Sequence, residues 1–205
     1  MRISLIMFLL FSICISAFGQ SDQQDTVILL NAFRAFYRSG QIVYVDTVEN
    51  CGFATERLKQ AIKKGKLTAI GKTRKDNFIK LNRSERKYLL EQIKIKTIWD
   101  DNLFCDSKRI CVDSLWTYLK KEKTKYYEEL NRSTLKKDSL TYNKLKYKYP
   151  YVFSFKKPIF LKDKTICLIS FTALCGNDCG RAEISFYKIQ NNEWKKWFVF
   201  AAGAF

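Results

Sequence analysis

The feature that most constrains the fold is a change from helical to strand-like spacing of apolar residues at Tyr149-Pro150. Proline disfavours helical geometry in the residue before it, so a helix that reaches this point ends there. Beyond it, β-branched and aromatic residues alternate over short segments, which is typical of strands. The expected strands are 151–155, 159–161, 165–173, 182–190 and 193–201.

Turn residues separate these strands. Lys162-Asp163-Lys164 fits one tight turn and Asn191-Asn192 another, because asparagine tolerates the positive φ that hairpin turns require. The sequence therefore predicts an antiparallel meander. Alternation along its last strand places Trp194, Phe198 and Phe200 on one face and Trp197 and Val199 on the other.

Helical patterns dominate the chain before Pro150. Helices are expected at 55–64, from Asn82 onward, and from a cap at Asp113 or Ser114, with continuation over 135–147. Residues 26–38 fit a helix or a strand, and 42–48 fit a strand. The predicted fold class is α+β: an N-terminal mostly helical region, about 20–149, followed by a C-terminal antiparallel β-meander, about 150–205, in a single domain spanning 20–205.

Residues 1–19 resemble a cleavable secretory signal peptide. Arg2 supplies the positive end, 3–15 is almost wholly apolar, and small residues precede a cleavage site between Gly19 and Gln20. The alternative is a retained membrane anchor, but the apolar run is shorter than the ~20 residues of a membrane span. The other alternative, a lipoprotein modified at Cys14, meets the bulky Ile13 at a position that normally holds a small residue. We therefore expect an exported, periplasmic or secreted protein with no membrane span after cleavage.

Cysteine usage agrees with export. Of seven cysteines, Cys14 leaves with the signal peptide, and the remaining even number suits a disulfide framework. Cys175 and Cys179, in the loop Cys175-Gly176-Asn177-Asp178-Cys179-Gly180, are expected to pair as a structural staple. Redox activity or zinc binding would be the alternatives, but the spacing differs from a thioredoxin-type pair. Weaker expectations pair Cys105 with Cys111 and Cys51 with Cys167.

The chain contains no histidine, which removes Ser-His and Cys-His catalysis and every histidine metal ligand. Nucleotide-binding, hydrolase-elbow and calcium-loop motifs are also missing, so the sequence predicts no catalytic residue, metal site or cofactor. Glycosidase chemistry needs only two carboxylates. Asp100, Asp101, Asp106 and Asp113 cluster in one segment and are candidates, although turn and cap roles also explain them.

The formal net charge of +17 would favour an anionic partner. The basic residues are spread from Arg34 to Lys196, as on a solvated surface, so nucleic acid is not the expected partner. Aromatic residues beside lysines, at 194–197 and 142–149, could stack on nucleic acid or glycan. A structural role is the simpler explanation for these aromatic residues, on alternating faces of a strand at 194–197 and along one stripe of a helix at 142–149. The sequence does not identify the partner, which could be a protein or an envelope polymer.

Residues 153–160, Ile166-Cys167-Leu168, the loop 175–180 and residues 193–197 together carry a resemblance. This series is similar to a group of small, uncharacterised exported proteins of Bacteroidota, most specifically over residues 153–198. The resemblance implies export and a disulfide-bearing sheet, and it implies no activity.

The first functional hypothesis is an exported soluble module with a non-enzymatic interaction or envelope-associated role. One alternative is a carboxylate-dependent hydrolase of envelope glycans, which requires two carboxyl groups in one pocket. The other is a basic protein that binds anionic polymers, with affinity that falls steeply with salt.

Overall fold

The computed structural model describes most of the chain beyond residue 24. The described residues are 25–33, 42–49, 54–70, 77–101, 103–104, 107–135, 151–176 and 179–204. The predicted signal peptide and its cleavage site at Gly19 and Gln20 lie outside them. Within the described ranges, every helix is too short or too polar to cross a membrane.

The centre of the molecule is a mixed sheet, which has seven strands among the described residues. Its order is β11-β10-β9-β7-β1-β6, with β8 paired to β9. The strands are β1 (Val43–Val45), β6 (Lys108–Ile110), β7 (Val152–Phe155), β8 (Ile159–Leu161), β9 (Ile166–Gly176), β10 (Cys179–Gln190) and β11 (Glu193–Ala204).

The predicted layout of an N-terminal helical part and a C-terminal meander is wrong. Strand β1 comes from the N-terminal half and runs parallel to both β7 and β6, so the sheet is mixed and draws on both halves of the chain. All three residues of β1 are buried, as expected for a strand covered on both faces. The helices are likewise distributed around the sheet.

The individual C-terminal strands and their turns are confirmed. Strands β7 to β11 pair antiparallel in the described part of the sheet. Asn191 and Asn192 have φ of 54° and 59°, as both central residues of a type I′ hairpin turn require. Lys162, Asp163 and Lys164 also have positive φ, of 51°, 51° and 63°.

The predicted faces of the last strand are wrong for Trp194 and Trp197, whereas Phe198 and Phe200 belong to one core cluster as predicted. Two register shifts interrupt the pairing of β10 with β11, between Ile184 and Ser185 and between Phe186 and Tyr187. Each extra residue reverses the alternation of side chains. As a result Trp194 packs with Phe160 in one core cluster, whereas Phe198 and Phe200 belong to the cluster on the opposite face.

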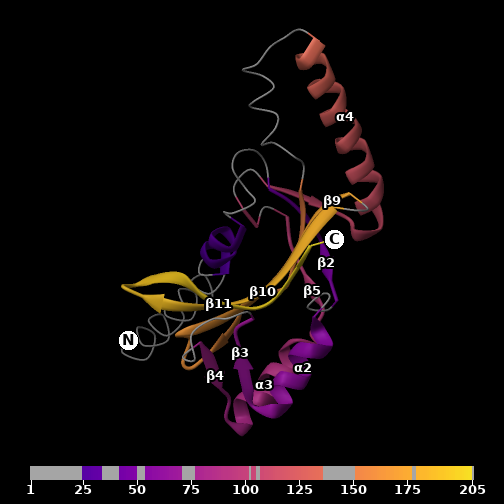
Figure 1. Cartoon of the computed structure of the whole chain (residues 1–205). Helices are drawn as coiled ribbons and strands as arrows, with labels where there is room; N and C mark the ends of the chain where they lie inside the picture. Colours follow the sequence, from indigo (N-terminus) through magenta and orange to yellow (C-terminus); the bar gives the residue numbers. More distant parts are fainter. Residues whose placement is uncertain are drawn as a thin grey trace, which may run out of the picture.

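One face of the sheet is covered by helices α2 (Thr55–Lys64) and α3 (Arg83–Gln92) and by the hairpin of β3 (Lys66–Thr68) and β4 (Phe78–Lys80) (Figure 1). Both predicted helices are confirmed. Asn82 caps α3 in a capping box with Glu85, and Gly65 ends α2 in a left-handed conformation. Leu58, Ile62 and Leu89 are fully buried against the sheet.

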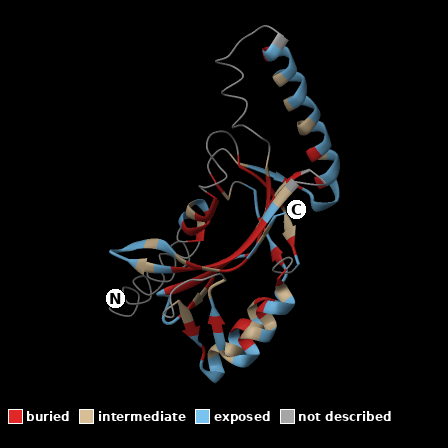
Figure 2. Cartoon of the chain, in the orientation of Figure 1, coloured by how far each residue is buried: buried red, intermediate tan, exposed pale blue. Residues whose placement is uncertain are grey.

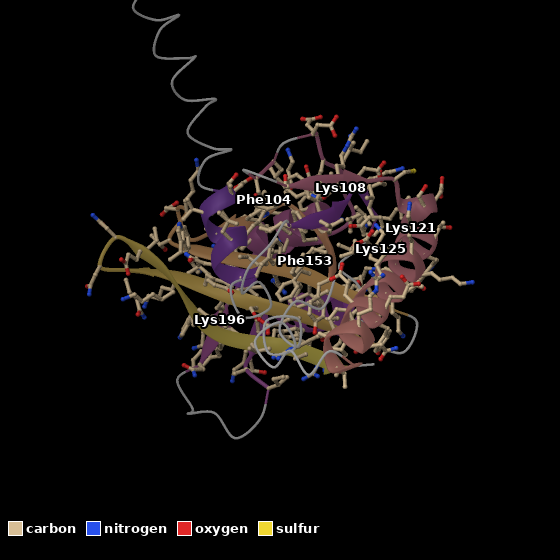
Figure 3. The ribbon with its side chains drawn as sticks, turned by 90° about the horizontal axis from the view of Figure 1, so that it is seen from above. Phe104, Lys108, Lys121, Lys125, Phe153 and Lys196 are labelled. Carbon is tan, nitrogen blue, oxygen red and sulfur yellow. The ribbon has the colours of Figure 1, made fainter. Side chains whose placement is uncertain are left out.

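The opposite face carries a helix at residues 25–33, which lies over the long strands when seen from above (Figure 3). Its Phe33 is fully buried and stacks on Phe153, with ring centroids 4.5 Å apart, beside Phe155 and Phe171. Trp99 belongs to the same cluster. Figure 2 shows the resulting arrangement: buried residues follow the central strands, and exposed residues lie on the outer sides of the helices.

Helix α4 (Leu115–Leu135) follows the 3₁₀ turn η1 (Val112–Ser114) and extends away from the sheet (Figure 1). Leu115 and Leu119 are buried and anchor its first turns in a third core cluster. The predicted stripe is less buried further along, at Tyr126 and Leu130. The predicted continuation over 135–147 lies outside the described residues after Leu135.

Candidate functional site

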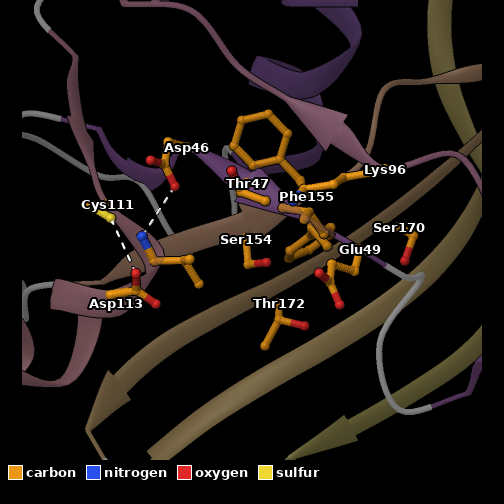
Figure 4. A pocket seen from close by; sticks show the side chains of 13 residues that line it. Asp46, Thr47, Glu49, Lys96, Cys111, Asp113, Ser154, Phe155, Ser170 and Thr172 are labelled. Atoms are coloured by element: carbon orange, nitrogen blue, oxygen red, sulfur yellow. Dashed lines mark hydrogen bonds between the residues drawn. The ribbon is translucent and has the colours of Figure 1, made fainter.

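A cavity of about 630 Å³ opens at the carboxyl ends of the parallel strands β1, β6 and β7 (Figure 4). Asp46 directly follows β1, Cys111 directly follows β6, and Ser154 and Phe155 end β7. Ligands of open sheets with parallel strands bind outside these carboxyl ends. The cavity therefore lies where such sheets place their binding sites.

Asp46 is held by contacts to three other segments. Its backbone N–H donates to Ile110 O (2.9 Å), and its carbonyl accepts from Trp99 N–H (2.8 Å). Its side-chain Oδ1 accepts from Val112 N–H at 3.1 Å, the dashed line that starts at Asp46 in Figure 4. The carboxylate thereby satisfies a backbone donor at the start of η1, as a helix cap does. Asp46 thus reaches the cavity in a fixed position.

Two further carboxylates line the cavity. Asp113 comes from η1, and its Oδ2 lies 4.0 Å from the Cys111 thiol. Glu49 comes from the segment after β2 (Thr47–Val48), which pairs with β5 (Thr97–Ile98). Lys96 is the only lysine in the described lining. Among the described residues, the local charge of the cavity is therefore negative although the whole chain has a formal net charge of +17.

Hydroxyl groups form another part of the lining. Ser154 on β7 and Thr172 on β9 are directly paired across the two strands, and Ser170 and Thr47 also line the cavity. Because a hydroxyl both donates and accepts, these side chains complement carboxylates that only accept. The cavity offers hydrogen bonds of both kinds on a rigid sheet.

A buried lysine supports the cavity wall. Lys156 is only 3% exposed, and its Nζ donates to the carbonyls of Glu49 (3.1 Å), Ile93 (3.1 Å) and Ile95. Burying a charge is costly unless hydrogen bonds satisfy it, and these carbonyls do so. Lys156 thereby ties the Glu49 segment to the end of α3, and we regard it as a positioning residue.

The aspartates predicted as candidates do not converge. Asp101 forms an ion pair with Arg109 Nε at 2.7 Å, and Asp100 uses its carbonyl to accept from the Tyr44 hydroxyl at 2.8 Å. Asp106 lies outside the described residues. Among the described aspartates of this cluster, Asp113 alone lines the cavity, where it joins Asp46 and Glu49, which the sequence analysis missed. The predicted strand 42–48 contains Asp46, so only the structure, in which β1 ends at Val45, shows that Asp46 directly follows a strand.

Two predicted disulfides are wrong. The structure records Cys111 as an exposed free thiol and Cys167 as a buried free thiol, so the bridges Cys105–Cys111 and Cys51–Cys167 are not formed. Cys167 is fully buried in the middle of β9, opposite Tyr187, where aromatic side chains surround it. Burial, with a contribution from the Asp25 charge, raises the pKa of the Cys167 thiol far above its ordinary range.

Cys175 is disulfide-bonded, and it is buried at the end of β9. Its partner cysteine is not among those with described side chains. The backbone register places Cys179 opposite Gly176, next to Cys175. The pairing of Cys175 with Cys179 therefore stays a prediction, and Cys51 and Cys105 lie outside the described residues.

The basic and aromatic residues of the last strand are engaged within the molecule. Trp194 lies against Phe160 (centroids 5.8 Å apart), and Lys188 lies 5.4 Å from the centroid of Trp197. Lys196 donates to the buried Glu183 at 2.5 Å. Packing accounts for these residues, whereas 142–149 lie outside the described part of the chain.

Metal binding finds no support in the described part of the chain, where no three Cys, Asp or Glu side chains are grouped to hold an ion.

Comparisons of the chain with protein-family models, with curated proteins and with solved structures found no match. The functional argument therefore rests on the cavity at the carboxyl ends of β1, β6 and β7.

Proposed function

We propose that this chain is an exported binding module that holds a small polar molecule in the cavity at the carboxyl ends of β1, β6 and β7. The observation that carries the proposal is the lining itself: three carboxylates, one lysine and several hydroxyl groups around about 630 Å³. Small-molecule sites have volumes of ≈ 300–1,000 Å³ and a few fixed polar groups. The signal peptide expected from the sequence supports export.

The way the polar groups are held favours binding. Asp46 is fixed by its hydrogen bond to Val112 N–H, and Ser154 and Thr172 lie on paired strands. Glu49 is tethered through its carbonyl to the buried Lys156. Groups that are already ordered lose little conformational entropy when a ligand arrives, which increases affinity. The site is thus preorganised by contacts that do not involve a ligand.

Cys111 provides a direct test, because its exposed free thiol lines the cavity. A panel of saccharides, polyols and amines would be screened for slower alkylation of Cys111, resolved by peptide mass spectrometry, and for a raised melting temperature. The buried Cys167 thiol is the internal control for global unfolding. We expect at least one compound to protect Cys111 and to stabilise the fold.

Two variants locate the effect. Glu49→Gln should weaken binding of that compound by roughly 10- to 100-fold, because a hydrogen bond to a charged group contributes about 1.5–3 kcal/mol. Glu56→Gln is the matched control, since Glu56 is an exposed carboxylate of α2 that pairs with Lys59. If no compound protects Cys111, or if both variants behave alike, the cavity is not the binding site.

A second candidate function is hydrolysis of an envelope glycan. It is favoured by the presence of Asp46, Glu49 and Asp113 in one cavity, because glycoside hydrolysis requires a pair of carboxyl groups. The purified protein would be incubated with peptidoglycan and with neutral oligosaccharides, and reducing ends would be measured. Turnover that Glu49→Gln and Asp113→Asn both abolish would support it, and unchanged substrate after prolonged incubation would exclude it for these glycans.

A further inference from the structure

Trp116 is a large aromatic side chain left half exposed, at 52%, in the first turn of α4. No hydrogen bond, ring contact or cation–π contact engages its indole in the part of the chain that the structure describes. Val112, four residues earlier, is also exposed, at 41%, and lines the cavity. An apolar surface therefore adjoins the polar cavity.

Trp116 follows two residues that line the cavity, Val112 and Asp113, at helical spacing. Asp113 lies in the 3₁₀ turn η1 and Trp116 in the α-helical turn that continues it, three residues later. Side chains at i and i+3 eclipse in a 3₁₀ helix, and on an α-helix their Cβ atoms lie about 5–6 Å apart. The rotation of α4 is fixed by Leu115 and Leu119, both buried in the core. Trp116 and the cavity-lining Asp113 are therefore neighbouring side chains on the same side of this helical segment.

The charges and hydroxyl groups of the lining select the class of ligand. The carboxylates of Asp46, Glu49 and Asp113 disfavour an anion in the cavity. The positive charges elsewhere on the chain are screened by salt, so the carboxylates alone do not distinguish a neutral ligand from a cation. The hydroxyl groups of the lining do, because they favour a ligand that itself carries hydroxyls over one that carries only charge. To use both the carboxylates and the paired Ser154 and Thr172, the ligand must carry several hydroxyl groups.

We propose that the ligand is a neutral saccharide, with one sugar ring in the cavity and the next sugar ring, or the same ring's apolar face, stacked on Trp116. A pyranose has this dual character, because its hydroxyls project around the ring and its C–H groups form an apolar face. The hydroxyls bind the carboxylates and hydroxyl side chains, and the C–H face covers the indole. This assignment rests on the proposed binding function of the cavity.

The test uses the full chain and neutral oligosaccharides of glucose, galactose, mannose and N-acetylglucosamine. Binding is measured by titration calorimetry and by protection of Cys111 from alkylation. We expect one of these saccharides to protect Cys111. Trp116→Ala should weaken its affinity by roughly 3- to 10-fold, the factor that corresponds to about 0.5–1.5 kcal/mol for an aromatic contact.

Tyr127→Ala is the matched control, because Tyr127 is an exposed aromatic residue, at 44%, further along α4. It should bind as the wild type does, and Trp116→Phe should retain most of the affinity. Circular dichroism checks that each variant is folded. Saccharide binding that Trp116→Ala leaves unchanged would overturn the stacking role.

Other outcomes separate this inference from the proposed function. If spermidine protects Cys111 and every neutral saccharide fails, the saccharide assignment is overturned while the cavity remains a binding site. If neither class of compound protects Cys111 or raises the melting temperature, the proposed function fails as well.

Discussion

The buried thiol of Cys167 should make the protein lose stability at alkaline pH. Its side chain is fully buried, and desolvation raises the pKa of the folded-state thiol far above the value of about 8.5 in an unfolded chain. Above that value the unfolded chain releases the thiol proton while the folded protein retains it. The unfolded state then binds fewer protons, so raising the pH favours unfolding.

The magnitude follows from the linkage relation. Each pH unit inside this window lowers the free energy of unfolding by about 1.4 kcal/mol for one such group, so the Cys167 contribution between about pH 8.5 and pH 10 is about 2 kcal/mol. Burial and the Glu183 charge also raise the pKa of Tyr187, which adds a second loss above about pH 10. Below the unfolded-state pKa of each group, its contribution to stability is fully present.

Urea denaturation from pH 7 to pH 10 would measure this dependence for the wild type and for Cys167→Ala. The variant is expected to start less stable, because it loses buried volume, but to show a flatter decline with pH. Cys111→Ser is the control, because it removes an exposed thiol in place of the buried one. If the wild-type and Cys167→Ala curves run parallel above pH 8.5, the buried thiol does not control alkaline stability.

Three further substitutions test the fold by chemical denaturation. Tyr187→Phe should stabilise the protein by about 1 kcal/mol, because the Tyr187 hydroxyl is buried without a hydrogen-bond partner among the described residues; a loss of stability would show a hidden partner. Gly65→Ala should cost about 1–2 kcal/mol, since Gly65 has φ of 74° and ends α2, whereas a neutral result would mean that the left-handed turn relaxes. Phe33→Ala should cost about 3–5 kcal/mol, because the ring packs against Phe153, Phe155 and Phe171, and a cost below 1 kcal/mol would contradict the packing described for this face.

Local features of the fold were predictable because they depend on neighbouring residues. The capping box of Asn82 and Glu85 marks the start of α3, and the positive φ of Asn191 and Asn192 closes the last hairpin. Helix α2 was predicted at the residues it occupies, Thr55–Lys64. Each of these elements depends on backbone chemistry within a few residues.

The candidate site was largely unpredictable, because its contacts join distant segments. Val112 and Asp46 are 66 residues apart, and Lys156 and Glu49 are 107 residues apart. The sequence indicated the Asp100 to Asp113 cluster because these aspartates are close along the chain. Of those aspartates that the structure describes, only Asp113 lines the cavity, and Asp101 pairs with Arg109 instead.

The sequence by itself determined the helices α2 and α3, the approximate positions of the C-terminal strands and the turns that join them, whereas the short strands β3, β4, β5 and β6 were not predicted. Tertiary structure decided that β1 inserts beside β7 as a parallel strand, that bulges reverse the face of β11, and that Cys111 and Cys167 remain free thiols. The physical reason is that alternation, capping and turn formation are local, whereas strand pairing, bulges and cavities depend on residues that meet only when the chain is folded.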